Sequence, residues 1–222
     1  MPKTFLGLLK QHRPFVISYL VFILIGLLLK LFFSKASIFL FINGFHSDFF
    51  DGFFKAITYL GDGCTVVIVG IALLFVKYRY SVLTFMVCIY TSAVAQILKH
   101  IFNAPRPIKY FEGISPIRTI EGYPVHGSYS FPSGHTMSAF SLAVLFIYIL
   151  PGKSKYWFIF PIAALTAFSR IYLAQHFLED IMAGSVLAVV LTFQLIWWLE
   201  NKKWYHSDQL DGKLFGKKQS PH

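Results

Sequence analysis

The chain is poor in charge, in acidic residues above all, and in cysteine. Only 14% of its 222 residues are charged, and 10 Asp and Glu stand against 20 Lys and Arg. So little charge in a chain that is 56% hydrophobic argues against an ordinary soluble domain. Its two cysteines, Cys64 and Cys88, both lie in apolar runs, so we expect neither a structural disulfide nor a cysteine metal cluster.

The hydrophobic residues gather into long runs, and six of these runs are candidate membrane spans. Several approach the roughly 20 residues that a helix needs to cross a bilayer. The runs are residues 15–33, 64–76, 80–98, 134–150, 156–172 and 181–198. The second is short and needs residues from its flanks. The first is too long for a signal-peptide core and has no small-residue cleavage site, so we expect it to be retained.

The sequence therefore predicts an all-α, polytopic membrane protein, a bundle of about six transmembrane helices. Residues 1–200 form the integral-membrane domain, and residues 201–222 form a basic, mobile tail on the cytoplasmic side. Residues 36–63 mix many Phe side chains with scattered charges. Two interpretations of this segment stay open: a helix lying in the membrane interface, or a loop helix packed on the bundle.

The net charge of +10 invites a nucleic-acid interpretation, but the positions of the basic residues explain it differently. With a cytoplasmic N-terminus, 12 of the 20 basic residues fall at cytoplasmic ends, as the positive-inside bias predicts. They are Lys3, Lys10, Arg13, Lys77, Arg79, Lys153, Lys155, Lys202, Lys203, Lys213, Lys217 and Lys218. We therefore expect the membrane, and no nucleic acid, as a partner, and the sequence indicates no protein partner.

Three polar motifs stand at span ends that this topology brings to the opposite face. Lys99 ends the third run and Arg106–Pro107 follows it, in a segment whose prolines predict that the helix stops before Arg106. Residues 132–135 read PSGH and begin the fourth run. A Pro- and Gly-rich connection, residues 103–131, joins these two motifs, and long ordered loops are often functional.

The third motif reads SRIYLAQHFLED, residues 169–180, and joins the fifth and sixth runs. Arg170 ends one run, while His176 and Asp180 open the next with the i,i+4 spacing that lets a carboxylate reach an imidazole on a helix. An arginine in an apolar run is energetically costly and usually faces a polar cavity.

Each of these residues also has a plainer interpretation. Lys99 fits a lysine that extends from a helix end to the interface, and Arg106 fits a loop charge. His135 fits a hydrogen-bonded histidine at a helix end, and His176 with Asp180 fits a structural pair. Their joint occurrence at three span ends on one side favours a single site.

The set suits one chemical task, which is phosphoryl transfer. Three cations can surround a phosphate dianion, with a hydroxyl and backbone N–H groups added by a helix start: Lys99, Arg106 and Arg170, with Ser133 and Gly134.

The remaining three residues supply the groups that such a transfer needs. His176 can attack phosphorus as a neutral imidazole, Asp180 can orient its ring, and His135 can carry the proton of the leaving oxygen. We expect no metal and no other cofactor, because no carboxylate cluster offers itself to Mg²⁺.

The pattern K-x6-RP, PSGH and SR-x5-H-x3-D resembles the type-2 phosphatidic acid phosphatase superfamily, whose soluble relatives include the vanadium haloperoxidases. The motifs cover about residues 95–185, and every position that we can match is present. The resemblance implies an α-helical bundle, a phosphohistidine at His176, and His135 as acid and base. It also implies Lys99, Arg106 and Arg170 as phosphate ligands.

The resemblance implies a membrane lipid phosphate as substrate: phosphatidylglycerophosphate, undecaprenyl diphosphate, phosphatidic acid or a lipid A phosphate. It places the protein in a bacterial cytoplasmic membrane, with the site facing the periplasm or exterior. The alternatives are a non-catalytic lipid-binding protein of the same fold, a haloperoxidase, and a transporter or channel. A transporter would hold its charges nearer the midplane and in symmetric halves, and neither feature occurs in this sequence.

The topology generates the first prediction. A cysteine placed at Gly113, in a chain whose own two cysteines are changed to serine, should react with a membrane-impermeant maleimide added to intact cells. A cysteine at Lys213, in the tail, should react only after lysis. Protection of position 113 in intact cells would overturn the proposed orientation.

Overall fold

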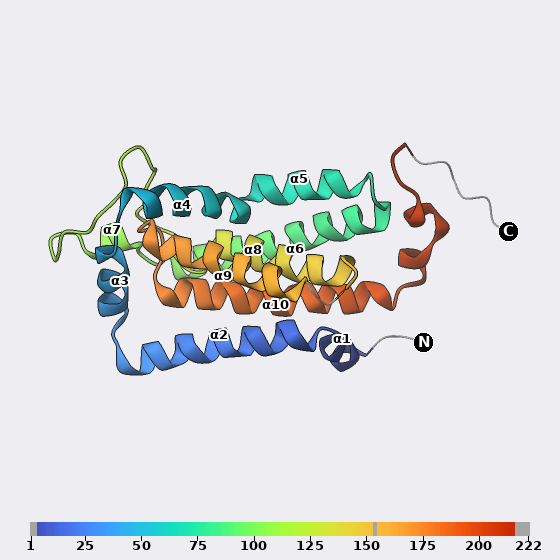
Figure 1. Ribbon diagram of the computed structural model, residues 1–222, viewed down its shortest axis with the longest axis horizontal. Helices are drawn as coiled ribbons and strands as arrows, with labels where there is room; N and C mark the ends of the chain where they lie inside the picture. Colours follow the sequence, from blue (N-terminus) through green and yellow to red (C-terminus); the bar gives the residue numbers. More distant parts are fainter. Residues whose placement is uncertain (1–3, 153–154, 216–222) are drawn as a thin grey trace.

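The computed structural model describes residues 4–152 and 155–215 of the chain, and its regular structure there is entirely helical. Figure 1 shows an elongated bundle in which the long helices run side by side along one axis. The all-α fold is confirmed. The α-helices are α1 (Phe5–Gln11), α2 (Arg13–Phe32), α3 (Lys35–Gly44), α4 (Asp48–Thr58), α5 (Gly63–Leu73), α6 (Tyr78–Phe102), α7 (Pro107–Tyr110), α8 (Gly134–Ile149), α9 (Tyr156–Tyr172) and α10 (Leu178–Glu200).

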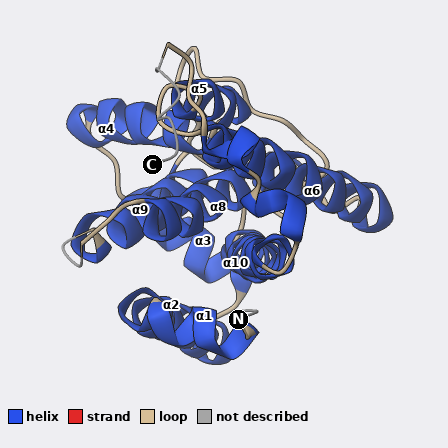
Figure 2. Cartoon of the chain, turned by 90° about the vertical axis from the view of Figure 1, so that its right-hand side faces the viewer, coloured by secondary structure: helices blue, strands red, loops and turns tan. Residues whose placement is uncertain are grey.

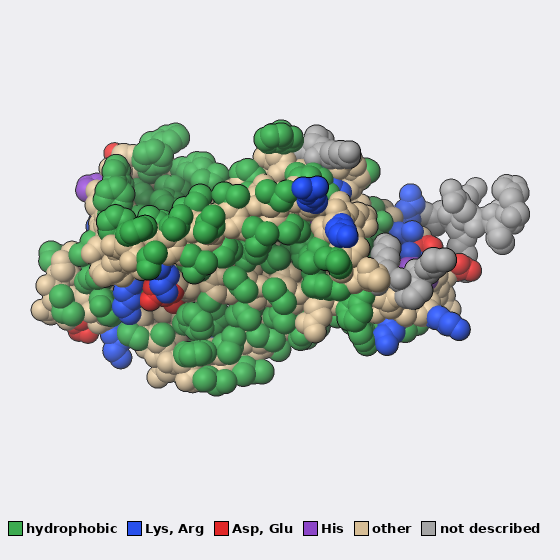
Figure 3. All heavy atoms as spheres, turned by 90° about the horizontal axis from the view of Figure 1, so that it is seen from below, with side chains coloured by type: hydrophobic (Ala, Val, Ile, Leu, Met, Phe, Trp, Pro, Cys, Tyr) green, Lys and Arg blue, Asp and Glu red, His purple; other side chains and the backbone are tan. Residues whose placement is uncertain are grey.

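The six predicted runs correspond to α2, α5, α6, α8, α9 and α10. Among the described helices, α2, α10 and the helical stretch that begins with α6 are long and apolar enough to cross a membrane. The pair α4–α5 passes the same test as one unit, with a bend of 55° at the break between its halves. Hydrophobic side chains cover most of the long flank in Figure 3, and charged side chains gather mainly toward its ends. Six spans remain a prediction.

The segment of residues 36–63 folds as two helices rather than one. It divides into α3, which lies across one end of the bundle, and α4, which runs along the bundle in line with α5 (Figure 1). The ring of Phe54 packs against that of Tyr172 in α9, with 4.4 Å between ring centroids. The face of α4 that carries Phe54 thus packs on the bundle. Helix α4 also supplies the flanking residues that the short second run, now α5, needs to reach the length of a span.

Helix α8 forms the centre of the bundle, with α6, α9 and α10 around it (Figure 2). Ten of its 16 residues are buried, as expected for a helix that is apolar on all sides. The Phe140 ring packs between those of Tyr19, Phe22 and Phe160, at centroid distances of 5.7–6.3 Å. This packing fixes the position of the PSGH turn at its N-terminal end.

The chain termini lie at one end of the bundle and the 103–131 connection at the other (Figure 1). The described part of the tail is not detached. Asp211 pairs with Lys77 and Arg79 at 2.7 Å each, and Lys77 lowers the pKa of the Asp211 carboxyl. Residues 216–222 lie outside the described residues, as do Lys3, Lys153, Lys217 and Lys218 of the predicted cytoplasmic set.

Arg118 anchors the middle of the long connection. Its backbone N–H and carbonyl exchange two hydrogen bonds of 2.8 Å with the side-chain amide of Asn43 in α3. Its guanidinium donates to both carboxylate oxygens of Asp51 in α4, and this carboxylate raises the pKa of Arg118. Tyr172 donates to the same carboxylate at 2.6 Å. Gly113 in this connection has a φ of 72°, a left-handed backbone conformation in which a cysteine would be strained. The cysteine of the topology experiment is therefore better placed at the exposed neighbour Glu112.

The anchor generates a prediction. Arg118→Ala leaves the Asp51 carboxylate without its paired donors and should destabilise the connection by about 1 kcal/mol, because the pair is partly exposed. In detergent, a Glu-specific protease should cut at Glu112 and Glu121 several times faster than in the parent chain. Lys109→Ala, an exposed residue of the same connection, is the matched control. Equal cleavage rates in all three proteins would contradict this role.

Candidate functional site

The three predicted motifs meet at the end of the bundle opposite the termini. A backbone hydrogen bond joins the second and third motifs: the N–H of Ser133 donates to the carbonyl of Asp180 at 3.1 Å, so the starts of α8 and α10 touch. The N–H groups of Gln175 and His176 both donate to the carbonyl of Arg170, at 2.9 and 3.1 Å. This tight turn holds the backbone of His176 against the last turn of α9.

His176 is buried, 1% exposed, and lies two residues before α10 rather than on it. Its Nδ1 atom is 3.5 Å from Oδ2 of Asp180, so the predicted contact is present. Asp180 also accepts the N–H of Phe177 at 2.9 Å, which ties the carboxylate to the start of the helix. Burial lowers the pKa of His176 to about 4, although Asp180 opposes the shift. The ring is therefore neutral near pH 7.

Ser130 completes this cluster, although it lies outside the three motifs and no role was predicted for it. Its hydroxyl donates to Oδ2 of Asp180 at 2.5 Å and lies 3.3 Å from Nδ1 of His176, fully buried. The only sequence signal was its place two residues before the PSGH motif. The hydroxyl orients the carboxylate that orients the imidazole.

Arg106 follows the predicted break, since α6 ends at Phe102 and Arg106 is the cap residue just before the short helix α7. The guanidinium is 7% exposed, and Nε donates to the carbonyl of Ser128 at 3.0 Å. Nη1 donates to Oε1 of Gln175 at 2.7 Å. Gln175, for which no role was predicted, donates from its side-chain amide to the carbonyl of Pro124 at 3.0 Å. Its amide fixes the direction of the Arg106 side chain.

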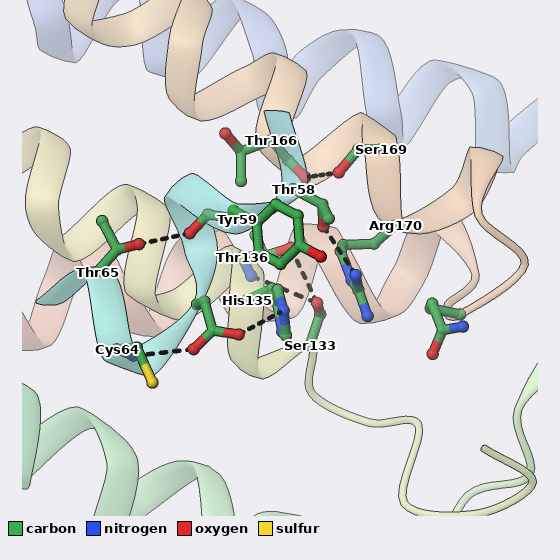
Figure 4. Close-up of polar contacts among 12 residues, drawn as sticks. Thr58, Tyr59, Cys64, Thr65, Ser133, His135, Thr136, Thr166, Ser169 and Arg170 are labelled. Carbon is green, nitrogen blue, oxygen red and sulfur yellow. Dashed lines mark hydrogen bonds and ion pairs between the residues drawn. The ribbon is translucent and has the colours of Figure 1, made fainter. Parts of the chain in front are cut away.

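Arg170 lies in the last turn of α9 and is 4% exposed. Its Nη1 donates to Thr58 Oγ1 at 2.8 Å and to the Tyr123 hydroxyl at 2.9 Å. Nε is buried and finds no hydrogen-bond acceptor within the described part of the chain. Figure 4 shows the side chain beside the turn that carries Ser133 and His135. A buried donor without a partner is costly, and an anion bound here would satisfy it.

Lys99 and His135 line a pocket of about 200 Å³. The pocket also contains Gly61, Gly134 and Ser138, among others. A Cβ atom on Gly134 would lie 3.8 Å from Nζ of Lys99, so the lysine reaches the start of α8. A larger hollow of about 690 Å³ lies along residues 108–117 and holds none of the predicted site residues.

Ser133 lies at the start of α8, as predicted, and is the residue that caps this helix. Its backbone N–H is taken by Asp180, and its hydroxyl caps α8 by accepting from the N–H of Thr136 at 3.4 Å and from the Thr136 hydroxyl at 3.0 Å. Within residues 4–152 and 155–215, no group of three or more His, Cys, Asp and Glu side chains is placed to hold a metal ion.

Two bacterial phosphatases are similar in sequence to most of this chain. A Porphyromonas gingivalis lipid A 4'-phosphatase is 31% identical over 71% of this chain and 69% of its own. A Bacillus subtilis phosphatidylglycerophosphatase B is 30% identical over 62% of this chain and 69% of its own.

Two solved structures share the fold. Aquifex aeolicus LpxE superposes with a TM-score of 0.65 at 24% identity, over 72% of this chain and 93% of its own. A PAP2-type phosphatidylglycerolphosphate phosphatase from Bacillus subtilis gives 0.60 at 25% identity, over 84% and 96%. The model of the PAP2 superfamily matches residues 79–204, a stretch that contains all three motifs. The chain therefore belongs to the PAP2 superfamily.

Proposed function

We propose that this PAP2 membrane lipid phosphatase hydrolyses its substrate through a phosphohistidine formed on His176. The observation that carries the proposal is the buried, neutral imidazole, which Asp180 contacts at 3.5 Å and Ser130 at 3.3 Å. A neutral imidazole with one nitrogen held by a carboxylate is a competent nucleophile at pH 7.

The phosphate group would be held by Lys99, Arg106 and Arg170. The unpartnered Nε of Arg170 supplies a donor, and Gln175 and Ser128 hold the Arg106 guanidinium in one direction. Cations held in place in this way act most strongly as negative charge builds on phosphorus in the transition state.

In the first step, His176 attacks phosphorus, a P–N bond forms, and the P–O bond to the lipid breaks. Protonated His135 gives its proton to the departing lipid oxygen. Asp180 stabilises the positive charge on the His176 ring. In the second step, neutral His135 takes a proton from water, which attacks the phosphohistidine. The P–N bond breaks, inorganic phosphate leaves, and both imidazoles return to their starting states.

We also propose that the protein lies in a bacterial cytoplasmic membrane with its site at the periplasmic or outer face. The termini and the 103–131 connection lie at opposite ends of the bundle, which supports this arrangement (Figure 1). The basic residues at the end that holds the termini, Lys77, Arg79, Lys202 and Lys203 among them, favour that end as the cytoplasmic one.

For the substrate, a lipid A phosphate ranks before phosphatidylglycerophosphate. The relative named for lipid A is matched over 71% of this chain, and the one named for phosphatidylglycerophosphate over 62%. Both are phosphate monoesters carried by a lipid, so the same cradle would serve either.

The nucleophile has a direct test. After brief incubation with a 32P-labelled lipid phosphate and an alkaline quench, which preserves phosphohistidine, the parent chain should carry label. His176→Asn should carry none and should lose at least ~10³-fold in turnover, because the attacking nitrogen is gone. His135→Asn should retain label when the leaving group is a nitrophenol, since departure then needs no acid.

His206→Asn, at the other end of the molecule, is the matched control and should behave like the parent. Turnover retained by His176→Asn would reject the assigned nucleophile. A parent chain that binds lipid phosphate without releasing phosphate would favour the non-catalytic alternative.

Substrate choice generates the next prediction. Purified protein in mixed micelles should release phosphate from a lipid A phosphate with at least ~10-fold higher kcat/KM than from phosphatidylglycerophosphate, phosphatidic acid or undecaprenyl diphosphate, a difference of about 1.4 kcal/mol in transition-state binding. EDTA is present throughout, because the proposed mechanism uses no metal. Equal rates on all four would contradict the ranking, and loss of all activity in EDTA would contradict the mechanism.

A further inference from the structure

We propose that Asp62 is a positioning residue for His135: its carboxylate holds the imidazole in place and favours the protonated ring that the first step uses. This inference rests on the proposed function of His135. It assigns a purpose to the break between α4 and α5, a segment outside the three motifs.

The two oxygens of Asp62 have separate contacts. Oδ1 accepts the N–H of Cys64 at 2.8 Å and so caps the start of α5. Oδ2 faces the site and lies 3.9 Å from Nε2 of His135. Figure 4 shows both contacts as dashed lines, to Cys64 on one side and to His135 on the other. One oxygen is needed for the helix cap, and the other is directed at the imidazole.

Close packing makes this approach possible. A Cβ atom on Gly61 would lie 2.6 Å from the carbonyl oxygen of His135 and 2.9 Å from the Thr166 side chain. Only glycine allows the break to touch the start of α8 in this way. Thr58, three residues earlier, accepts the hydrogen bond from Arg170. The bend between α4 and α5 thus contacts two of the proposed catalytic and binding residues.

Electrostatics around His135 explain why a carboxylate matters there. The groups that act on its ring are Lys99 from α6, Arg170 from α9, His176 from the turn before α10, and Asp62 from the start of α5. Burial is the largest influence on this ring and opposes its protonation; the cations Arg170 and Lys99 oppose it as well, and a protonated His176 would add to them. Asp62 is the anion of this set, and an opposite charge at about 4–6 Å favours the charged form.

The contact also indicates which nitrogen transfers the proton. With Nε2 turned toward Asp62, Nδ1 is left to give its proton to the departing lipid oxygen. The same nitrogen then takes one proton from the attacking water, so Asp62 itself never changes its protonation state. In this respect the pair acts as a triad carboxylate does on its histidine.

The test compares Asp62→Asn, Asp62→Glu and the control Asp48→Asn over pH 5–10. Asparagine caps helices about as well as aspartate, so Asp62→Asn removes the charge and keeps the start of α5. We expect the alkaline limb of kcat/KM to move to lower pH by about one unit, with an approximately tenfold loss at pH 8 and an unchanged KM. Asp62→Glu should restore much of the activity. Asp48, exposed in the first turn of α4, should give the parent profile.

An unmoved alkaline limb in Asp62→Asn would overturn the inference. So would an equal loss at every pH together with a lower unfolding temperature, since that pattern indicates a structural role. His135→Asn separates this result from failure of the proposed function. If that variant keeps full turnover, the acid and base assignment of His135 is wrong; if it is inactive while Asp62→Asn matches the parent, only the role of Asp62 is wrong.

Discussion

Positive charge buried at one end of an apolar bundle is the constraint on which the rest of the structure depends. Arg106 and Arg170 are 7% and 4% exposed, and Lys99 reaches the same region. Taking such groups out of water is costly unless hydrogen bonds and opposite charge compensate them. Ser128, Gln175, Thr58 and Tyr123 supply neutral acceptors, which orient the guanidinium groups without neutralising them. The arrangement is thus suited to a dianion that arrives with the substrate.

The fold meets this constraint by fixing the backbone around the site. Helix α8 is buried on nearly all sides, so the turn that precedes it cannot shift without disturbing the core. Ser133 caps α8 and donates its N–H to Asp180, which joins that turn to the start of α10. The same Asp180 contacts His176 and Ser130. The Asp180 carboxylate therefore both accepts the N–H of Phe177 at the start of α10 and contacts the imidazole of His176.

The long connection has a comparable double role. Asn43 and Asp51 hold Arg118 near its middle, and the segments around it bring Tyr123 to Arg170 and Pro124 to Gln175. Its residues cover the cations from outside and supply acceptors to them. This explains why a loop rich in proline and glycine is ordered here: its polar groups are bonded to the bundle.

The sequence by itself determined the helical class, the positions of the apolar runs, and the motif residues, because hydrophobic length and fixed spacing are local properties of the chain. The break before Arg106 was likewise predictable from its prolines. Only the tertiary structure decided the contacts of Ser130, Gln175 and Thr58, because their partners His176, Arg106 and Arg170 lie 46, 69 and 112 residues away along the chain. The same holds for the approach of Asp62 to His135. The course of α4 was also decided by packing, since Phe54 finds its partner Tyr172 far along the chain. No local pattern encodes a contact between distant segments.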